Sequence, residues 1–207
     1  MSELELEPRE AQDLFGDRIE LGRQFVADLA REGETRGLIG PLELPRLWTR
    51  HVLNSALVAP LLSGRVGDVG SGAGLPGLVV AIVRPDVDLV LIEPMERRTD
   101  WLREEAEALG LSNVEVVRSR AEDYRPAVQL DQVTARAVSA LSKLIPITAP
   151  LVRPGGELVL LKGERAATEV DAAAKAIRRF GLTDVRVEVL GEGVVSEPTR
   201  VVRATRS

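Results

Sequence analysis

From residue 65 onward, the sequence alternates short runs rich in Val, Leu and Ile with longer segments of helical periodicity. We expect strands at residues 66–69, 87–92, 114–117, 131–135, 157–161, 185–190 and 200–204. We expect helices between them, at about residues 75–84, 96–109, 139–152 and 166–180. Such alternation is typical of a parallel sheet covered on both faces, because parallel strands need long crossover connections. The sequence therefore predicts an α/β fold, and such folds bind ligands at the carboxyl ends of their strands.

The two ends of the chain depart from this alternation. The last two expected strands are separated by no helix and are joined by the turn GEGVVSEP, which predicts an antiparallel hairpin at the sheet edge. Residues 9–32 and 45–62 space their apolar side chains as helices do. We therefore expect an N-terminal helical extension over residues 1–64, followed by one compact domain over residues 65–207.

Composition excludes several classes of protein. The chain has no cysteine and one histidine, so we expect no disulfide and no zinc site. No apolar run reaches the ~18–20 residues of a membrane helix. The first residues, MSELELEPREAQ, are acidic, unlike a signal peptide. Residues 1–35 carry ten acidic and four basic side chains, whereas the rest of the chain carries 22 and 23. We expect a cytoplasmic monomer without metal, whose nearly neutral body can present a local basic face.

A glycine-rich stretch at residues 68–77, DVGSGAGLPG, follows a predicted strand and opens a predicted helix. Glycines let the backbone turn sharply and let a ligand approach it closely, and a helix N-terminus offers free N–H groups. Gly72, Gly74 and Gly77 also satisfy the dinucleotide-binding pattern G-x-G-x-x-G, a weak indication by itself. The stretch predicts a cofactor site in which Gly70, Gly72 and Gly74 contribute backbone contacts.

Acidic residues at successive strand ends favour one kind of cofactor. Asp68 precedes the first glycine, where a carboxylate would receive an ammonium group, directly or through water, and would repel a pyrophosphate. Glu93 ends the second strand, in place to accept both hydroxyls of a ribose. Ala121, Glu122 and Asp123 follow the third strand, where an adenine amino group would be read. Together these acceptors indicate S-adenosylmethionine, with ordinary strand-end turns as the alternative, above all for Glu122.

Residues 66–124, VGDVGSGAGLPGLVVAIVRPDVDLVLIEPMERRTDWLREEAEALGLSNVEVVRSRAEDY, strongly resemble the RsmG (GidB) family of ribosomal RNA small subunit methyltransferases. The segments RHVLNS at 50–55, TARAVSAL at 134–141 and LLKGE at 160–164 extend the resemblance to roughly residues 40–165. GSGAGLPG together with a downstream SRAE and ARA is far more specific than a glycine motif alone. One departure is Asn54, where many relatives carry Asp, and it leaves the role of this position open.

The resemblance implies a Rossmann-like class I S-adenosylmethionine-dependent methyltransferase. Its sheet would have seven strands, mostly parallel, with an antiparallel final strand. The resemblance also implies methylation of a guanine N7 in 16S ribosomal RNA, with the RNA or the small ribosomal subunit as partner. The family's cofactor contacts carry over onto Gly70, Leu75, Ala121, Glu122 and Arg136.

The residues present restrict the chemistry of transfer. Methylation of cytosine C5 needs a cysteine nucleophile, which the chain lacks. Exocyclic amines are usually methylated beside an Asn/Asp-Pro-Pro-aromatic element, and residues 134–137 read TARA instead. A guanine N7 already exposes a lone pair, so its transfer needs positioning and no general base. The candidate catalytic residue is Arg136, holding the cofactor or an RNA phosphate, because a donor on N7 would block the nucleophile.

Basic residues near this edge are expected to contact RNA, with packed or solvated side chains as the alternative: Arg50, His51, Arg97, Arg98 and Lys162. Two other functions stay open. A methyltransferase of a small molecule or protein would keep the fold and the cofactor. An NAD-binding oxidoreductase or dinucleotide sensor would use the G-x-G-x-x-G pattern, against which Asp68 and the C-terminal hairpin argue.

Overall fold

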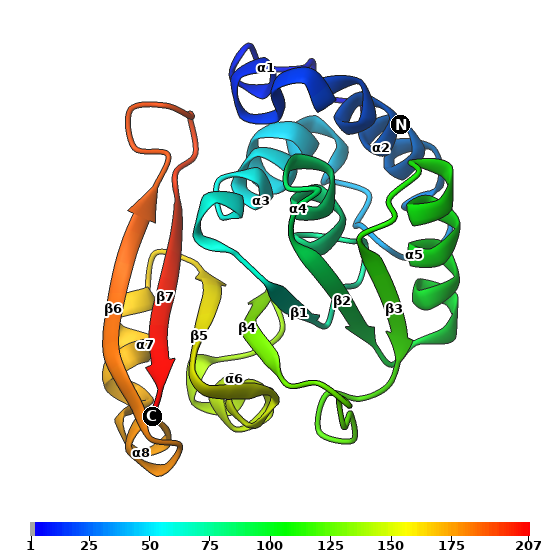
Figure 1. The fold of residues 1–207 in the computed structure, drawn as a ribbon. Helices are drawn as coiled ribbons and strands as arrows, with labels where there is room; N and C mark the ends of the chain where they lie inside the picture. The colour runs from blue at the N-terminus through cyan, green and yellow to red at the C-terminus, as the bar shows by residue number, and fades with distance from the viewer. Residues whose placement is uncertain (1–2) are drawn as a thin grey trace.

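The computed structural model describes residues 3–207, which contain one seven-stranded sheet (Figure 1). Its strands are β1 (Arg65–Val69), β2 (Asp88–Glu93), β3 (Val114–Arg118), β4 (Leu130–Arg136), β5 (Val152–Lys162), β6 (Leu182–Leu190) and β7 (Thr199–Arg206). Their spatial order is β3-β2-β1-β4-β5-β7-β6. The first five strands pair in parallel, whereas β7 is antiparallel to both β5 and β6. The expected strands and the C-terminal antiparallel hairpin are confirmed.

Helices follow the strands as the alternation predicted, with two differences in continuity. They are α4 (Gly77–Val83), α5 (Glu96–Ala108), α6 (Leu141–Thr148), α7 (Ala166–Ala172) and α8 (Ala174–Arg179). The helix expected over residues 166–180 is divided at Ala173, whose φ of −89° and ψ of 1° leave helical geometry. The helix expected over residues 139–152 stops at Thr148 and tightens into a 3₁₀ turn, Ala149–Leu151, in which Pro150 has no N–H to donate.

The first expected helix is also divided. α1 (Glu10–Phe15) and α2 (Ile19–Glu32) are separated by a 3₁₀ turn, Gly16–Arg18. Gly16 has a φ of +54° and a ψ of −132°, a conformation that ends α1 and that glycine adopts more readily than other residues.

The prediction of one regular helix over residues 45–62 is wrong. The segment consists of a 3₁₀ turn (Leu44–Arg46), a π-helical turn (Leu47–Leu53), α3 (Asn54–Ala56) and a second 3₁₀ turn (Ala59–Leu61). Side chains compete here with the main chain, since Asn54 Nδ2 donates to the Arg50 carbonyl at 3.0 Å and Ser55 Oγ to the His51 carbonyl at 2.7 Å. The widened turn therefore contains two of the residues expected to contact RNA, and such turns are frequent at functional sites.

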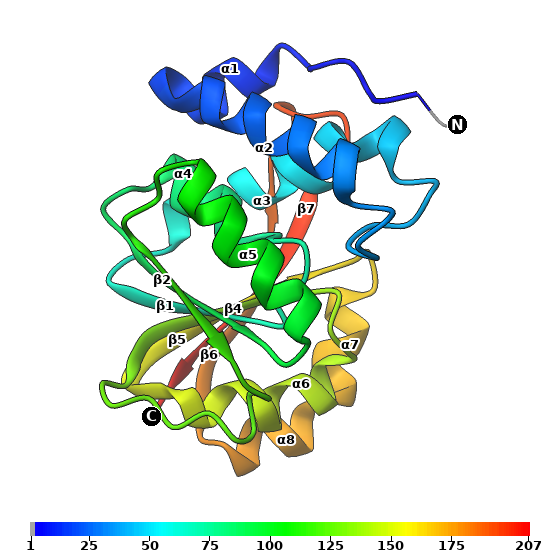
Figure 2. The same ribbon diagram turned by 90° about the vertical axis from the view of Figure 1, so that its right-hand side faces the viewer.

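The sheet has a hydrophobic core on each face, because successive side chains of a strand point to opposite sides. Leu89 and Leu91 of β2 pack in the core covered by α1–α5, whereas Val90 and Ile92 pack in the core covered by α6–α8. The two helical layers are visible in Figure 2. The N-terminal helices share the first core with α4 and therefore form part of the cover of the sheet. Within residues 3–207, no helix is both long and apolar enough to cross a membrane.

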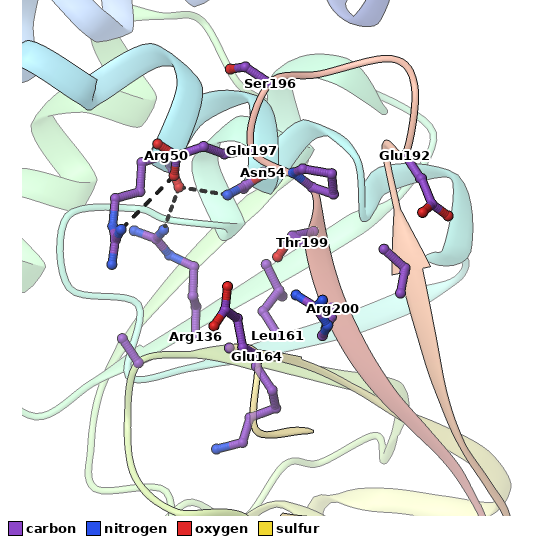
Figure 3. A pocket seen from close by; sticks show the side chains of 15 residues that line it. Arg50, Asn54, Arg136, Leu161, Glu164, Glu192, Ser196, Glu197, Thr199 and Arg200 are labelled. Atoms are coloured by element: carbon purple, nitrogen blue, oxygen red, sulfur yellow. Dashed lines mark hydrogen bonds and ion pairs between the residues drawn. The ribbon is translucent and has the colours of Figure 1, made fainter. Parts of the chain in front are cut away.

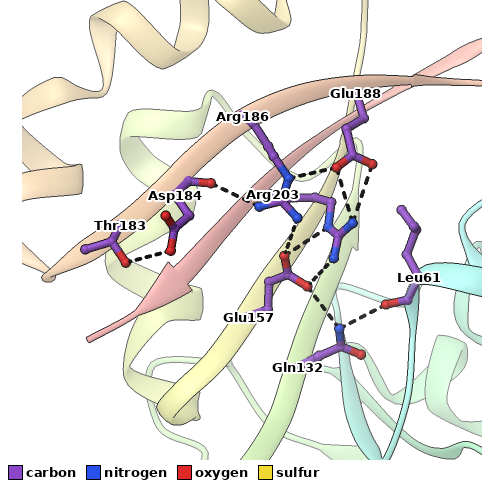
Figure 4. Close-up of polar contacts among 8 residues, drawn as sticks. All are labelled: Leu61, Gln132, Glu157, Thr183, Asp184, Arg186, Glu188 and Arg203. Atoms are coloured by element: carbon purple, nitrogen blue, oxygen red, sulfur yellow. Dashed lines mark hydrogen bonds and ion pairs between the residues drawn. The ribbon is translucent and has the colours of Figure 1, made fainter.

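A polar network ties the C-terminal hairpin to the sheet (Figure 4). Glu157 of β5 accepts hydrogen bonds from Arg203 of β7 at 2.7 and 2.9 Å and from Arg186 of β6 at 3.2 Å. Gln132 of β4 donates to the same carboxylate at 3.2 Å. One carboxylate thus joins four strands and helps to set the register of the hairpin.

The order of the strands determines where a binding crevice opens in the sheet. From β1 the chain builds outward through β2 and β3 on one side, and β4 then pairs on the other side of β1. Loops leaving β1 and β4 at their carboxyl ends therefore diverge to opposite faces, which opens a crevice at that edge.

Candidate functional site

The glycine loop, residues 70–77, connects β1 to α4 at this carboxyl edge. Gly70, Gly72 and Gly74 have φ values of +71°, +54° and +92°. A Cβ atom on Gly70 would lie 2.9 Å from Val138 Cγ2, whereas one on Gly72 would meet no protein atom beyond its chain neighbours closer than 3.7 Å. The backbone at Gly72 therefore leaves open space that a ligand can enter.

The glycine loop is held by its neighbours. The indole N–H of Trp101, from α5, donates to the Ala73 carbonyl at 3.1 Å, and the Gly70 N–H donates to the Ile92 carbonyl at 2.8 Å. Trp101 is 2% exposed, and Leu75 is buried in the same core. The loop therefore has its shape before any ligand arrives.

Asp68 lies at the carboxyl end of β1 and is completely buried. Its Oδ2 accepts the N–H of Gly77 at 3.0 Å, at the start of α4, while its Oδ1 is buried without a hydrogen-bond partner. Burial raises the pKa of Asp68 to about 7, against the lowering effect of the Gly77 N–H. The carboxyl group caps α4, and only Oδ1 is left for the ligand contact predicted from the sequence.

Glu93 ends β2 beside the glycine loop and is 2% exposed. Its Oε2 accepts the Gly72 N–H at 3.0 Å, and its Oε1 accepts the Met95 N–H at 3.0 Å. Arg98 Nη1 lies 3.9 Å from Oε2. Each carboxylate oxygen has further lone pairs, so this fixed carboxylate can still accept hydroxyl donors from a ligand.

The turn after β3 completes this row of strand ends. The Ser119 N–H donates to the Glu93 carbonyl at 3.2 Å, which joins the turn to the end of β2. Ala121 is 7% exposed and packs in the core under α6, whereas Glu122 is exposed. The structure thus brings the glycine loop and Glu93 into contact and places Ala121 on the next strand end.

Arg136 ends β4, on the other side of β1, and is half-buried. Its Nη2 lies 2.8 Å from His51 Nδ1, and its Nη1 donates to the Arg50 carbonyl at 3.4 Å. Burial lowers the pKa of Arg136 to about 10, which still leaves the side chain charged at neutral pH. Asp68 opposes this lowering, because its carboxylate favours the charged form of Arg136. The two side chains are therefore electrostatically coupled.

A cavity of about 720 Å³ opens beside Arg136 (Figure 3). Its walls come from the π-helical turn, the ends of β4 and β5, and the loop between β6 and β7. Charged and amide side chains line it: Arg50, Asn54, Arg136, Lys162, Glu164, Glu192, Glu197 and Arg200. Arg50 is 4.0 Å from Glu197, and Asn54 Oδ1 is buried without a partner. The cavity is large enough for a nucleotide base and offers both donors and acceptors to it.

The residues expected to contact RNA lie in different surroundings. Arg50 lines the cavity and is exposed, and Arg97 is exposed on α5. Arg98 faces Glu93, on the cofactor side. Lys162 has an 8% exposed side chain, and its ammonium contacts Glu169 at 2.8 Å and the Ser139 carbonyl at 2.7 Å. Lys162 therefore holds the loop after β4 in place, and its ammonium is already paired within the protein.

Two parts of the site were missed by reasoning from the sequence. Glu43 lies between the two segments expected to be helical, where no functional residue was expected, yet its Oε2 is 2.5 Å from His51 Nε2. The turn between β6 and β7 was considered only as a connection, yet it contributes Glu192 and Glu197 to the cavity. No spacing in the sequence links these residues to Arg136. Within residues 3–207, no group of three or more His, Asp or Glu side chains is arranged to hold a metal ion.

Comparison with known sequences gives matches over nearly the whole chain. A family model, GidB, described as rRNA small subunit methyltransferase G, matches residues 18–197. The ribosomal RNA small subunit methyltransferase G of Leifsonia xyli subsp. xyli is 66% identical over 203 residues, covering 98% of this chain and 97% of the relative. The protein of the same name from Corynebacterium glutamicum is 46% identical over 204 residues, covering 96% of this chain and 92% of the relative.

Comparison with solved structures supports the fold. A SAM-dependent methyltransferase from Aquifex aeolicus aligns with a TM-score of 0.59 at 21% identity, covering 84% of this chain and 98% of that one. The N-methyltransferase NodS from Bradyrhizobium japonicum, in complex with S-adenosyl-L-homocysteine, aligns with a TM-score of 0.56 at 17% identity, covering 88% and 98%. At these identities the likeness concerns the architecture alone.

Proposed function

Since the chain belongs to the GidB family, described as rRNA small subunit methyltransferase G, we propose that it transfers a methyl group from S-adenosylmethionine to the N7 of a guanine in 16S ribosomal RNA. The observation that supports this most strongly is the position of two sites on one sheet edge. The glycine loop and Glu93 lie on one side of β1, and the cavity beside Arg136 lies on the other. A cofactor and a base bound there would meet at the end of β1.

The residues on the cofactor side fit S-adenosylmethionine. The open backbone at Gly72 admits a ligand, and Glu93 presents a fixed carboxylate for ribose hydroxyls. The unpaired Oδ1 of Asp68 suits the ammonium group of an amino-acid moiety, because a buried acceptor without a partner is costly. We assign the other contacts to Gly70, Gly74, Leu75, Ala121 and Glu122. When bound, the cofactor supplies an electrophilic methyl group.

The cavity fits a guanine that has left its stack. Guanine presents N–H donors on its Watson–Crick edge and acceptors at O6 and N7. Glu164 and Glu197 can accept from the donors, while Arg50 can reach phosphate or O6. Arg136 lies between the two sites. The N7 atom carries a lone pair and therefore needs no general base to attack the methyl group. Positioning alone would then account for the rate.

The test is methyl transfer from labelled S-adenosylmethionine to RNA from a strain that lacks the family's enzyme. Intact small subunits, their naked 16S RNA and 23S RNA are compared as substrates. We expect label in 16S RNA, free or within the subunit, and none in 23S RNA. Equal labelling of both RNAs, or label only in protein or small molecules, would overturn the proposal in favour of a different substrate.

Two binding measurements support this test. Affinity for the RNA substrate should fall as salt rises, because phosphate contacts release counterions. S-adenosylhomocysteine should raise the melting temperature and NAD should not, since only a ligand bound by the folded state stabilises it. Stabilisation by NAD alone would instead indicate a dinucleotide site.

A further inference from the structure

His51 has both ring nitrogens engaged in the crevice beside the cavity. Its Nδ1 lies 2.8 Å from Arg136 Nη2, and its Nε2 lies 2.5 Å from Glu43 Oε2. Its side chain is 13% exposed. The three side chains form a chain of contacts from the N-terminal segment to the end of β4, which we call the Glu43–His51–Arg136 relay.

The chemistry of the partners determines where the imidazole proton lies. A guanidinium can only donate, so His51 Nδ1 must accept from Arg136 through its lone pair. The remaining proton is then on Nε2, which donates it to the Glu43 carboxylate. A second proton on Nδ1 would place a donor against a donor and break the contact with Arg136. The relay therefore requires a neutral imidazole in a single tautomer.

Arg136 has few other contacts that fix its orientation. Within the described residues, no carboxylate lies within 4.0 Å of its guanidinium, and its Nε is buried without a partner. Its second contact, to the Arg50 carbonyl, is longer, at 3.4 Å. The bond to His51 is thus the main restraint on the plane of the guanidinium.

Charged groups contact the imidazole at both ring nitrogens. Glu43, itself bonded to Arg46, faces Nε2. Arg136, which Asp68 influences electrostatically, faces Nδ1, and Arg50 beside Glu197 also acts on the ring. Burial and then Arg136 hold the pKa of His51 below its usual range, and Glu43 opposes them. The imidazole therefore stays neutral at physiological pH, as the relay requires.

We propose that His51 is a positioning residue, which uses Glu43 to fix its tautomer and its Nδ1 to hold the Arg136 guanidinium at the junction between cofactor and target base. The inference rests on the proposed function. It predicts that methyl transfer falls in acid as Nδ1 is protonated, because the guanidinium then loses its orientation.

The single histidine allows a direct test of the tautomer. In the ¹⁵N-histidine NMR spectrum of the full chain at neutral pH, Nε2 should carry the proton and Nδ1 should show the shift of an unprotonated nitrogen. Arg136→Ala should change the Nδ1 shift, whereas Arg153→Ala should leave it unchanged. Arg153 serves as the control because it pairs with Asp131 at the amino-terminal ends of β4 and β5, at the other end of these strands from Arg136. A protonated Nδ1, or an Nδ1 shift that is the same in Arg136→Ala and in the wild type, would overturn the relay. Neither result depends on an activity measurement.

Two substitutions separate positioning from packing. The amide of Asn reaches about as far as Nδ1, so His51→Asn can still accept a hydrogen bond from Arg136. The amide of Gln reaches about as far as Nε2, so His51→Gln can donate to Glu43 but cannot accept from Arg136. Single-turnover methylation should fall about 100-fold in His51→Gln and clearly less in His51→Asn. Because Asp68 also titrates in this crevice, with a pKa of about 7, the protonation of His51 is followed through its own Nδ1 shift. Glu43→Gln should lower the pH at which that shift titrates, because the carboxylate favours the charged imidazole. Equal losses of rate in both His51 variants, or an Nδ1 titration unchanged in Glu43→Gln, would refute the positioning role. A wild-type protein inactive on rRNA would refute the proposed function, and the NMR measurement would still decide the relay.

Discussion

Alanine at Gly72 should weaken cofactor binding beyond its effect on stability, and Gly16 provides a matched control. Both glycines have a φ of +54°, and neither has a protein atom beyond its chain neighbours within 3.4 Å of the position that a Cβ would occupy. Alanine at a positive φ costs roughly 1–3 kcal/mol, and the cost at Gly16 lies at the upper end because its ψ of −132° is outside the αL region. Each kilocalorie should lower the melting temperature of a chain of this size by about 2–4 °C. The Gly16 variant should therefore lose stability as well, which controls for the effect of destabilisation on ligand binding.

The two variants should differ in ligand affinity. At Gly72 the added methyl group enters the space we assign to the cofactor, beside the N–H that Glu93 accepts. We expect at least a tenfold loss of S-adenosylhomocysteine affinity, about 1.4 kcal/mol, in Gly72→Ala and none in Gly16→Ala. Calorimetric unfolding and isothermal titration of the two proteins measure these quantities. Unchanged affinity in Gly72→Ala, or an equal loss in Gly16→Ala, would refute the assignment of the glycine loop.

Three further predictions concern charged side chains. Glu93→Gln should weaken cofactor binding by about 1–3 kcal/mol because charge-assisted bonds to the ribose are lost, and a normal cofactor KM in Glu93→Ala would contradict this role. Arg136→Ala and Arg136→Lys should both lower the single-turnover rate at saturating RNA by up to about 100-fold, and Arg153→Ala should leave it unchanged. A wild-type rate in Arg136→Lys would show that only the positive charge at this position matters. Burial raises the pKa of Glu105, in α5, to about 8 from an ordinary value of 4.5, so ionisation favours the unfolded chain and stability falls as pH rises between these values. Glu105→Gln should therefore stabilise the protein by about 1–3 kcal/mol more at pH 8 than at pH 4 in urea titrations, and an equal effect at both pH values would contradict it.

The sheet was predictable because it depends on local pattern. Strands and crossover helices alternate with clear hydrophobic periodicity, and the hairpin without a helix between its strands marks the C-terminal end. The glycine loop and Glu93 were predictable as neighbours because parallel strands end at a common edge. Helix continuity was less predictable, because a positive φ at Gly16 and a non-helical Ala173 each divide a periodic segment.

The other half of the site could not be predicted from spacing. The turn that carries His51 takes its irregular shape from side chains of Asn54 and Ser55 that bond to main-chain carbonyls. Its partner Arg136 is 85 residues away, and Glu43 joins it from a stretch without periodicity. Asp68 was expected to face a ligand, yet one of its oxygens caps a helix. These contacts depend on the packing of the N-terminal segment against the sheet, which no local pattern records.

The identity of the methylated nucleoside tests the central claim most directly. Small subunits or 16S RNA from a strain lacking the family's enzyme are incubated with the protein and S-adenosylmethionine labelled in its methyl group, then digested completely and analysed by mass spectrometry. The account predicts that the label appears as 7-methylguanosine at a single site, and that it forms up to about 100-fold more slowly with Arg136→Ala and at the wild-type rate with Arg153→Ala. Label in any other nucleoside, or 7-methylguanosine formed at the wild-type rate by Arg136→Ala, would contradict it.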